Sequence, residues 1–139
     1  MPKPDLRADV LLDTHVLIWW QAGSDLLSRQ ALSRIEHADR LLISPISFWE
    51  LSMLVRKERI GLDRATSAWV RDFLATDRVE VADLSPAVAV AAGELSNFHG
   101  DPADRLIVAT ARVAGATVIT KDHKILAYAA SSGLIAAQW

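Results

Sequence analysis

The chain has 139 residues, of which 51% are hydrophobic and 23% are charged. This length allows one globular domain with a real core and leaves no room for two, and the composition excludes an intrinsically disordered protein. The absence of cysteine excludes disulfides, thiolate zinc sites and cysteine nucleophiles. A net charge of -2 argues against a protein that coats nucleic acid by electrostatics alone.

No stretch of the sequence approaches the roughly 20 apolar residues that cross a bilayer. The N-terminal string MPKPDLRAD has no apolar segment after its charges and so does not resemble a signal peptide. We therefore expect a cytoplasmic protein. The two prolines near the N-terminus predict a loose lead-in over residues 1–9, followed by a single domain over residues 10–139.

The first half of the chain begins with the apolar run Val10–Leu12, which predicts a buried strand, and continues with helical patterns. Gly23 predicts the end of the first helix. Ser44 and Pro45 predict the start of the third, as its N-cap and first residue. The elements predicted up to residue 76 are, in order, a strand at 10–12, helices at 15–21 and 28–38, a strand at 41–44, and helices at 45–61 and 63–76.

The second half of the chain repeats this alternation. The pairs Ser85-Pro86 and Asp101-Pro102 predict helix starts, and Gly115 predicts a helix end. The elements predicted here are, in order, a strand at 79–84, helices at 85–96 and 102–115, a strand at 117–120, a short helix from 122 and a last strand at 134–137. Alternating strands and helices predict an α/β fold in which helices cover both faces of a parallel sheet.

Four acidic residues, which we call the acidic quartet, lie where a predicted strand meets a helix or just inside a helix: Asp13, Glu50, Asp104 and Asp122. Because the carboxyl ends of parallel strands meet at one edge of a sheet, we expect these side chains to converge. Converging carboxylates repel one another unless a cation neutralises them, and oxygen ligands favour Mg²⁺ or Mn²⁺. The sequence therefore predicts a metal-dependent enzyme that acts on phosphate esters.

Each acidic residue alone also has a purely structural interpretation. Asp13, Asp101 and Asp122 each precede a predicted helix and would serve as N-caps. Glu50 follows Ser47 by three residues, as in a capping box, although a helix start is already available one turn earlier. Only the joint placement of the quartet favours a site.

Basic residues lie beside the acidic segments. Arg105 directly follows Asp104 and could balance its charge or contact a phosphate, and Lys121 and Lys124 flank Asp122. A second basic group is explained equally well as a solvated helix face: Arg56, Lys57, Arg59 and Arg64. These residues are compatible with a phosphate-containing substrate and do not identify it.

The acidic residues occur within longer motifs. The strings LLDTHVLIWW, SPISFWEL, DPADRLIVATA and TKD, in this order from Val10 onward, resemble the PIN-domain ribonucleases. Within that family they are most similar to the VapC-type toxins of bacterial VapBC toxin–antitoxin pairs. The combination of four motifs, which spans essentially the whole chain, is specific, whereas a lone DTH or DPADR is not.

The resemblance implies a three-layer α/β/α sandwich with a mainly parallel sheet of about five strands. It implies that the acidic quartet is catalytic, binds Mg²⁺ or Mn²⁺ and cleaves RNA by means of metal-activated water. Thr14 and Thr120 fall beside the quartet and are expected to support its carboxylates or metal-bound waters. Asp101 belongs to the third motif and is expected to be its helix-starting acid.

The resemblance also implies partners. These are an RNA substrate, a second copy in a homodimer, and a cognate VapB-type antitoxin that inserts a segment into the active-site groove. We expect the antitoxin groove along the helices near residues 28–39 and 45–76, where Trp49, Trp69 and Phe73 would anchor a partner helix.

The sequence leaves three other classes of protein possible. A phosphoacceptor receiver domain is also small, α/β and Mg²⁺-binding, but it needs an acidic pair after the first strand, where this chain has Leu12-Asp13-Thr14. A DNA-directed nuclease of the flap-endonuclease kind usually carries more acids and long helical arches, for which 139 residues leave little room. A non-catalytic PIN-like scaffold is opposed only by the intact quartet.

Overall fold

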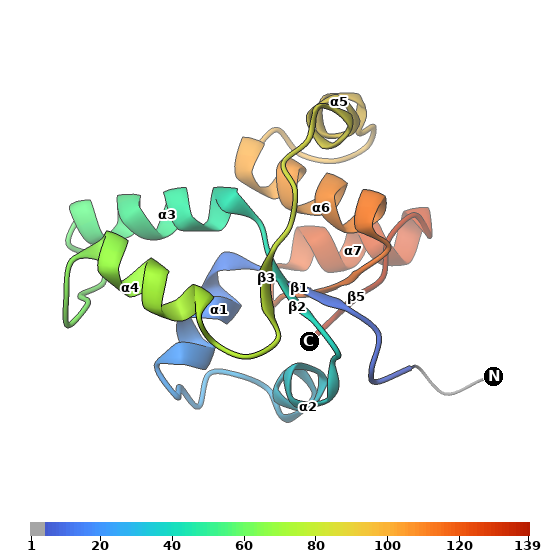
Figure 1. Cartoon of the computed structure of the whole chain (residues 1–139). Coiled ribbons are helices and arrows are strands. Elements are labelled where there is room, and N and C mark those ends of the chain that lie inside the picture. The colour runs from blue at the N-terminus through green and yellow to red at the C-terminus, as the bar shows by residue number, and fades with distance from the viewer. Residues whose placement is uncertain (1–4) are drawn as a thin grey trace.

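A five-stranded sheet lies at the centre of residues 5–139, the part of the chain that the computed structural model describes (Figure 1). Its strand order is β3-β2-β1-β4-β5, and every neighbouring pair is parallel. The strands are β1 (Val10–Leu12), β2 (Leu41–Ile43), β3 (Val79–Val81), β4 (Thr117–Ile119) and β5 (Ala137–Gln138). The expected α/β sandwich with a parallel sheet of about five strands is confirmed.

Helices connect the strands, as parallel pairing requires. Within the described residues they are α1 (Thr14–Gln21), α2 (Arg29–His37), α3 (Pro45–Arg56), α4 (Thr66–Leu74), α5 (Pro86–Glu94), α6 (Pro102–Ala114) and α7 (His123–Ser132). Local chemistry explains where several of them begin and end. Ser44, Ser85 and Asp101 each accept a backbone N–H as N-cap in front of a proline, and Gly115 ends α6 in the left-handed conformation.

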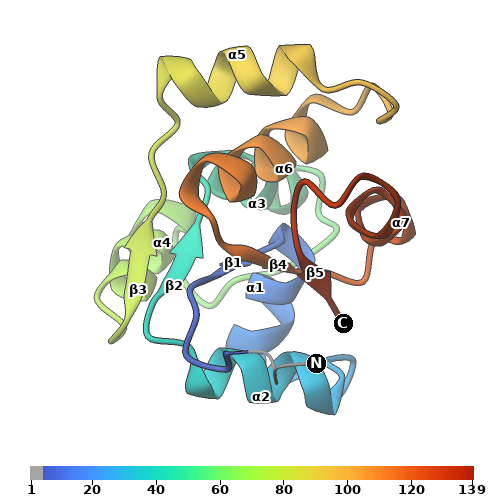
Figure 2. The same cartoon turned by 90° about the vertical axis from the view of Figure 1, so that its right-hand side faces the viewer.

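Alternate side chains of the strands face two separate cores, because successive residues of a strand point to opposite faces. Leu11, Leu42 and Val118 pack with residues of α6 and α7. On the other face, Val10, Leu12 and Ile119 pack with residues of α1, α2 and α4. Figure 2 shows α1 and α2 below the sheet and α6 above it. The result is the expected three-layer arrangement.

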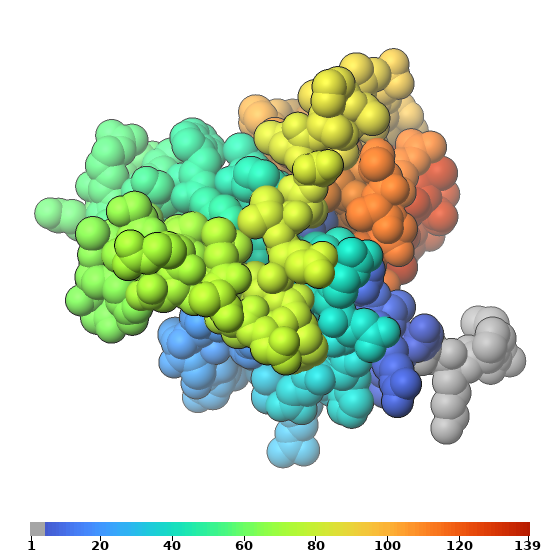
Figure 3. Space-filling view, in the orientation of Figure 1, coloured from blue at the N-terminus to red at the C-terminus, as the bar shows by residue number. Residues whose placement is uncertain are grey.

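Helix α5 adds a further layer on one side. It packs against α6 through Val88, Ala92 and Ala109, and in Figure 3 it projects, in yellow, from the top of the molecule. Val90 on this helix is 58% exposed. Helix α5 therefore covers α6 and leaves its own outer side open to solvent.

Several predicted boundaries are wrong. The fourth helix runs over Thr66–Leu74 rather than 63–76, and no side chain caps its start at Ala65. The third helix ends at Arg56 rather than near residue 61, because Glu58 adopts a left-handed φ of 58°. The third strand ends at Val81 rather than residue 84, since the chain leaves the sheet after Ala82 to begin α5. The last strand is Ala137–Gln138 rather than 134–137, because the chain must first return from the left-handed Gly133 that ends α7.

The expected loose lead-in falls partly on residues 1–4, which lie outside the described residues. Residues 5–9 contact α2 and the start of β2. The buried Arg34 donates from Nη1 to the carbonyl of Asp5 over 2.8 Å, and the Asp39 N–H donates to the carbonyl of Arg7. The division into a lead-in and one domain stays a prediction. No helix between residues 5 and 139 combines the length and the apolar character needed to cross a membrane.

Candidate active site

The first acid of the quartet, Asp13, directly follows β1 and is 4% exposed. Its Oδ1 accepts the N–H of Thr14 over 2.8 Å, so it is the N-cap of α1. Its Oδ2 accepts the hydroxyl of Thr120, at the end of β4, over 2.7 Å. The cap interpretation and the site interpretation are therefore both true, since the two bonds hold one carboxylate at the carboxyl edge of the sheet.

Glu50 is held from a different direction. The hydroxyl of Thr14 donates to Glu50 Oε1 over 2.6 Å and also lies 2.9 Å from the hydroxyl of Ser47. Because a hydroxyl carries one hydrogen, the chain of bonds runs from Ser47 to Thr14 to Glu50. Burial raises the pKa of Glu50, and the Thr14 bond partly opposes this rise. The capping box does not form, since Ser44 is the N-cap of α3.

Asp104 lies in the first turn of α6, behind the exposed N-cap Asp101, which accepts the Asp104 N–H over 3.1 Å. Its Oδ2 is 3.3 Å from Nε2 of His99, a nitrogen that makes no hydrogen bond in the described structure. Burial raises the pKa of Asp104 to about 7, and the charges of Asp13, Asp101, Asp122 and Glu50 add to this rise. The charges of Asp101, on the same segment, and of acids from three other segments therefore act on the Asp104 carboxyl.

Asp122 completes the group from the far side of the sheet edge. It is the N-cap of α7 and accepts the N–H groups of Lys124 and Ile125. Its own N–H donates to the hydroxyl of Thr120 over 2.9 Å, and this hydroxyl in turn bonds Asp13. Thr120 thus joins two of the acids, and its support of a metal site stays a prediction.

Sequence reasoning missed two residues of the site, Ser47 and His15. Nε2 of His15 accepts the Lys121 N–H over 3.0 Å, so its other nitrogen carries the hydrogen and faces Asp13 Oδ2 at 3.6 Å. Burial lowers the pKa of His15, which keeps the ring neutral. Ser47 is fully buried. The spacing could have indicated both, since each lies two or three residues from an acid of the quartet on the same helix.

Arg105 does not balance Asp104 in this structure. Its guanidinium donates to five backbone carbonyls in the segment between α5 and α6 and at the end of α5: those of Ala92, Gly93, Leu95, Phe98 and His99. It therefore holds the loop that carries His99. The expected contact of Arg105 with a phosphate is replaced by a structural role.

Three of the acids, Asp101, Asp104 and Asp122, line a cavity of about 430 Å³ that also contains basic side chains. Its lining residues are His99, Asp101, Asp104, Lys121, Asp122, His123 and Lys124. Lys121 and Lys124 are exposed and bring positive charge to the mouth of an acidic pocket. A phosphate group could therefore approach the carboxylates from this side.

The donors present fit a hard divalent cation in chemistry, because carboxylate oxygens are the ligands that Mg²⁺ and Mn²⁺ prefer. Burial and, after it, the charges of the neighbouring acids raise the pKa of Asp104, and a bound cation would relieve the repulsion between these charges. In residues 5–139, however, no three acidic or histidine side chains stand close enough together to hold one ion. Mg²⁺ is commonly held by one or two carboxylates with waters completing its shell, and this arrangement fits that pattern.

The fold and the acidic edge define the class of the protein. The family model for the PIN domain matches residues 10–131, so the chain belongs to the PIN domain family. It is 44% identical over 117 residues to the protein named Ribonuclease VapC22 of Mycobacterium tuberculosis, a match that spans 84% of this chain and 88% of that protein. The resemblance seen in the four motifs is confirmed, and the receiver-domain reading is excluded.

Solved structures share the fold at lower identity. The structure of VapBC2 from Rickettsia felis bound to a DNA fragment from its promoter matches with a TM-score of 0.65 and 18% identity, over 94% of this chain and 97% of that one. The structure of VapBC-1 from nontypeable Haemophilus influenzae matches with a TM-score of 0.64 and 20% identity, over 94% and 96%. At such identities the likeness establishes the fold alone.

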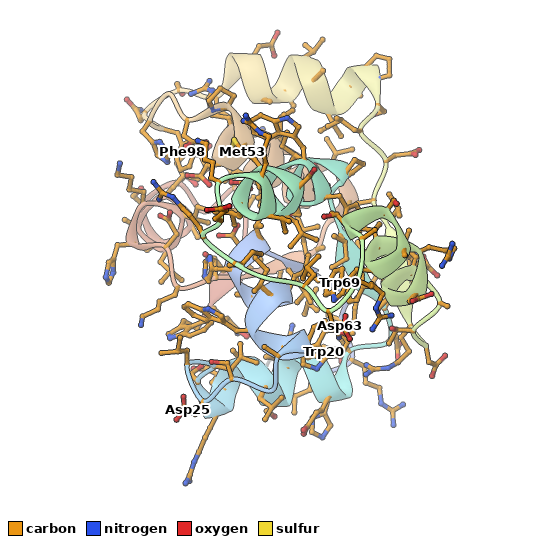
Figure 4. The ribbon with its side chains drawn as sticks, turned by 90° about the vertical axis from the view of Figure 1, so that its left-hand side faces the viewer. Trp20, Asp25, Met53, Asp63, Trp69 and Phe98 are labelled. Atoms are coloured by element: carbon orange, nitrogen blue, oxygen red, sulfur yellow. The ribbon has the colours of Figure 1, made fainter. Side chains whose placement is uncertain are left out.

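The aromatic anchors expected for an antitoxin are only partly available. Phe73 is 3% exposed and lies in the core, where Trp69 stacks on it with ring centroids 5.5 Å apart. Trp49, by contrast, is 57% exposed. Figure 4 shows Trp69 near Asp63 below α3, where both line a cavity of about 350 Å³. The prediction that all three rings face a partner is therefore wrong, because the α4 side of the groove packs into the core.

Proposed function

We propose that the protein is a metal-dependent endoribonuclease and the toxin of a type II toxin–antitoxin pair. The observation that carries this is the convergence of the charges of four other acids on Asp104, which lines a pocket that also contains lysines: Asp13, Glu50, Asp101 and Asp122. The 44% identity to a ribonuclease of the VapC group supports the substrate class.

The acidic quartet would hold Mg²⁺ or Mn²⁺, which when bound lowers the pKa of a water and neutralises the charge that builds on the phosphodiester. The protein's own residues prepare this chemistry. Thr120 fixes Asp13, and Thr14 fixes Glu50, so neither carboxylate needs to be ordered when the substrate arrives. Lys121 and Lys124 attract the RNA backbone to the pocket.

A VapB-type antitoxin would silence the enzyme, and a homodimer would be its assembled form. The structural neighbours include complexes named as VapBC pairs, which supports a protein partner. The cavity between α1 and residues 60–64, with Ile18, Leu51 and Trp69 in its wall, offers an apolar surface for an antitoxin segment. An antitoxin arginine could reach the acids and pair with them.

RNA cleavage tests the proposal. Purified protein is incubated with total bacterial RNA in Mg²⁺, in Mn²⁺ and in EDTA, and the new 5′ ends are mapped by sequencing. Asp104→Asn removes a ligand charge with little change in shape, and Asp39→Asn removes an exposed acid outside the site as a matched control. We expect metal-dependent cuts at defined positions in the wild type and Asp39→Asn, and none in Asp104→Asn.

Other outcomes have clear meanings. Equal cleavage by the wild type and Asp104→Asn would assign the activity to a contaminant. Absence of cleavage together with absence of Mn²⁺ binding by calorimetry would favour the non-catalytic scaffold. Light scattering after gel filtration tests the homodimer separately.

A further inference from the structure

One side of α3 carries an apolar stripe with a single acid inside it. Ile46, Trp49, Glu50 and Met53 have the spacing i, i+3, i+4 and i+7, which places them on one face of a helix. Trp49 is 57% exposed. Exposing so large an apolar ring to water costs free energy, so binding of a ligand or partner to this surface is favoured.

This stripe forms one wall of a cavity of about 370 Å³, and the start of α6 forms the other. The lining residues are Ile46, Trp49, Glu50, Met53, Asp101, Pro102 and Ala103. Figure 4 labels Met53 on the upper side of α3, opposite the side where Trp69 and Asp63 lie. The cavity is therefore separate from the surface that we assign to the antitoxin.

The cavity is continuous with the candidate active site through two acids. Glu50 lines it and also accepts the Thr14 hydroxyl beside Asp13. Asp101 lines it and also lines the acidic pocket that contains Asp104. A ligand in this cavity would thus lie directly next to the carboxylates of the candidate active site.

The chemistry of the walls selects the kind of ligand. A phosphate would be repelled by Glu50 and Asp101 and would find no cation among the lining residues. A flat, uncharged ring would instead stack on the Trp49 indole and pack against Met53 and Pro102. The carboxylates at the rim can accept hydrogen bonds from amino groups on the edge of such a ring.

We propose that Trp49 stacks on a nucleobase of the RNA adjacent to the cleaved phosphodiester. Trp49 would then help to determine at which position the RNA is cut. This inference rests on the proposed ribonuclease function. The lysines of the acidic pocket would hold the backbone, while the cavity between α3 and α6 takes the base.

A double-change cycle tests the inference on an RNA that the wild-type protein cuts at a mapped position. One change is Trp49→Ala in the protein, and the other is removal of one base from the RNA, at each of the three positions on either side of the cut. We expect each change alone to lower kcat/KM about 5- to 150-fold at one position, the loss that follows from removing one base–aromatic stack. Together they should lower it no further, because they remove the same contact.

Matched variants separate stacking from other roles of the residue. Trp49→Phe should restore most of the activity. Val113→Ala, at an equally exposed position near the other end of α6, should leave kcat/KM unchanged. The same samples are sized by light scattering.

Several results would overturn the inference. Losses that multiply at every position of the RNA would mean that Trp49 touches no base. A Trp49→Ala protein that changes its oligomeric state would assign the cavity to a contact between copies of the chain. If wild-type protein cleaves no RNA, the proposed function fails and this inference falls with it, whereas normal cleavage by Trp49→Ala refutes the stacking alone.

Discussion

Burial of Asp104, together with repulsion from the other acids of the site, predicts that removing its charge stabilises the metal-free protein. The pKa of Asp104 rises from 3.8 to about 7, so the folded state favours its protonated form. An acid with a raised pKa contributes stability that is complete below about pH 3.8 and is lost as the pH approaches 7. Asp104→Asn keeps a neutral side chain at every pH and avoids this loss.

The size of the effect follows from the shift. Moving from 3.8 to about 7 corresponds to about 4 kcal/mol at about 1.36 kcal/mol per pKa unit. The Asp104 carboxyl borders an open pocket, so solvent screening reduces this energy. We expect the substitution to raise the free energy of unfolding by about 2 kcal/mol. For a chain of this size that difference raises the midpoint of thermal unfolding by about 6 °C.

Urea unfolding in EDTA at pH 4, 6 and 8 measures the effect. The free energy of unfolding of Asp104→Asn should exceed that of the wild type by about 2 kcal/mol at pH 8, and the difference should almost vanish at pH 4. Asp39→Asn, which removes an exposed acid elsewhere, should follow the wild type at every pH.

Saturating Mn²⁺ should reverse the order at pH 8. An ion present at a hundred times its Kd for the folded wild type adds about 2.7 kcal/mol, and the variant lacks one of the ligands that we propose for it. An Asp104→Asn protein that in EDTA is less stable than the wild type by the same amount at pH 4 and pH 8 would contradict this prediction. That result would mean that the carboxyl packs well and feels little repulsion.

Three further substitutions test separate parts of the structure. Thr120→Val removes the hydroxyl that bonds Asp13, so Mn²⁺ affinity measured by calorimetry should fall about tenfold; Thr120→Ser should keep it, and a fall below twofold would contradict the role. Arg105→Ala frees five carbonyls and should cost about 2–4 kcal/mol in urea unfolding, against less than about 0.5 for the exposed Arg112→Ala on the same helix. Gly115→Ala, at a φ of 68°, should cost about 1 kcal/mol, and an unchanged midpoint would contradict the need for glycine there.

Local chemistry explains why the starts of α3 and α6 were predicted well, whereas α4, whose start has no side-chain cap, begins three residues later than predicted. Ser44 before Pro45 and Asp101 before Pro102 act within one turn of the chain, and both form the expected cap bonds. The end of α3 was misplaced because Glu58 adopts a left-handed conformation that glycine usually takes, and no residue type there signals it.

The hydrophobic pattern of the sequence did not distinguish aromatic residues of the surface from those of the core. Trp49, Trp69 and Phe73 all lie in amphipathic helical segments, yet Phe73 is in the core and Trp49 is exposed. Arg105 follows an acid in sequence but reaches back over the preceding loop, because its long side chain finds several free carbonyls there. The exposure of the aromatic rings and the partners of Arg105 both depend on how the helices and the loop pack in three dimensions.

The sequence by itself determined the α/β class, the parallel sheet and the acids that follow the strands, since alternation of apolar runs and capping residues is a local property. The tertiary structure alone decided which hydroxyl holds which acid. Thr14 bonds Glu50 across 36 positions of sequence, and Thr120 bonds Asp13 across 107. Such pairs form only when strands β1 and β4 and helix α3 are docked, because the direction of a side chain in space is set by packing and not by its neighbours in the chain.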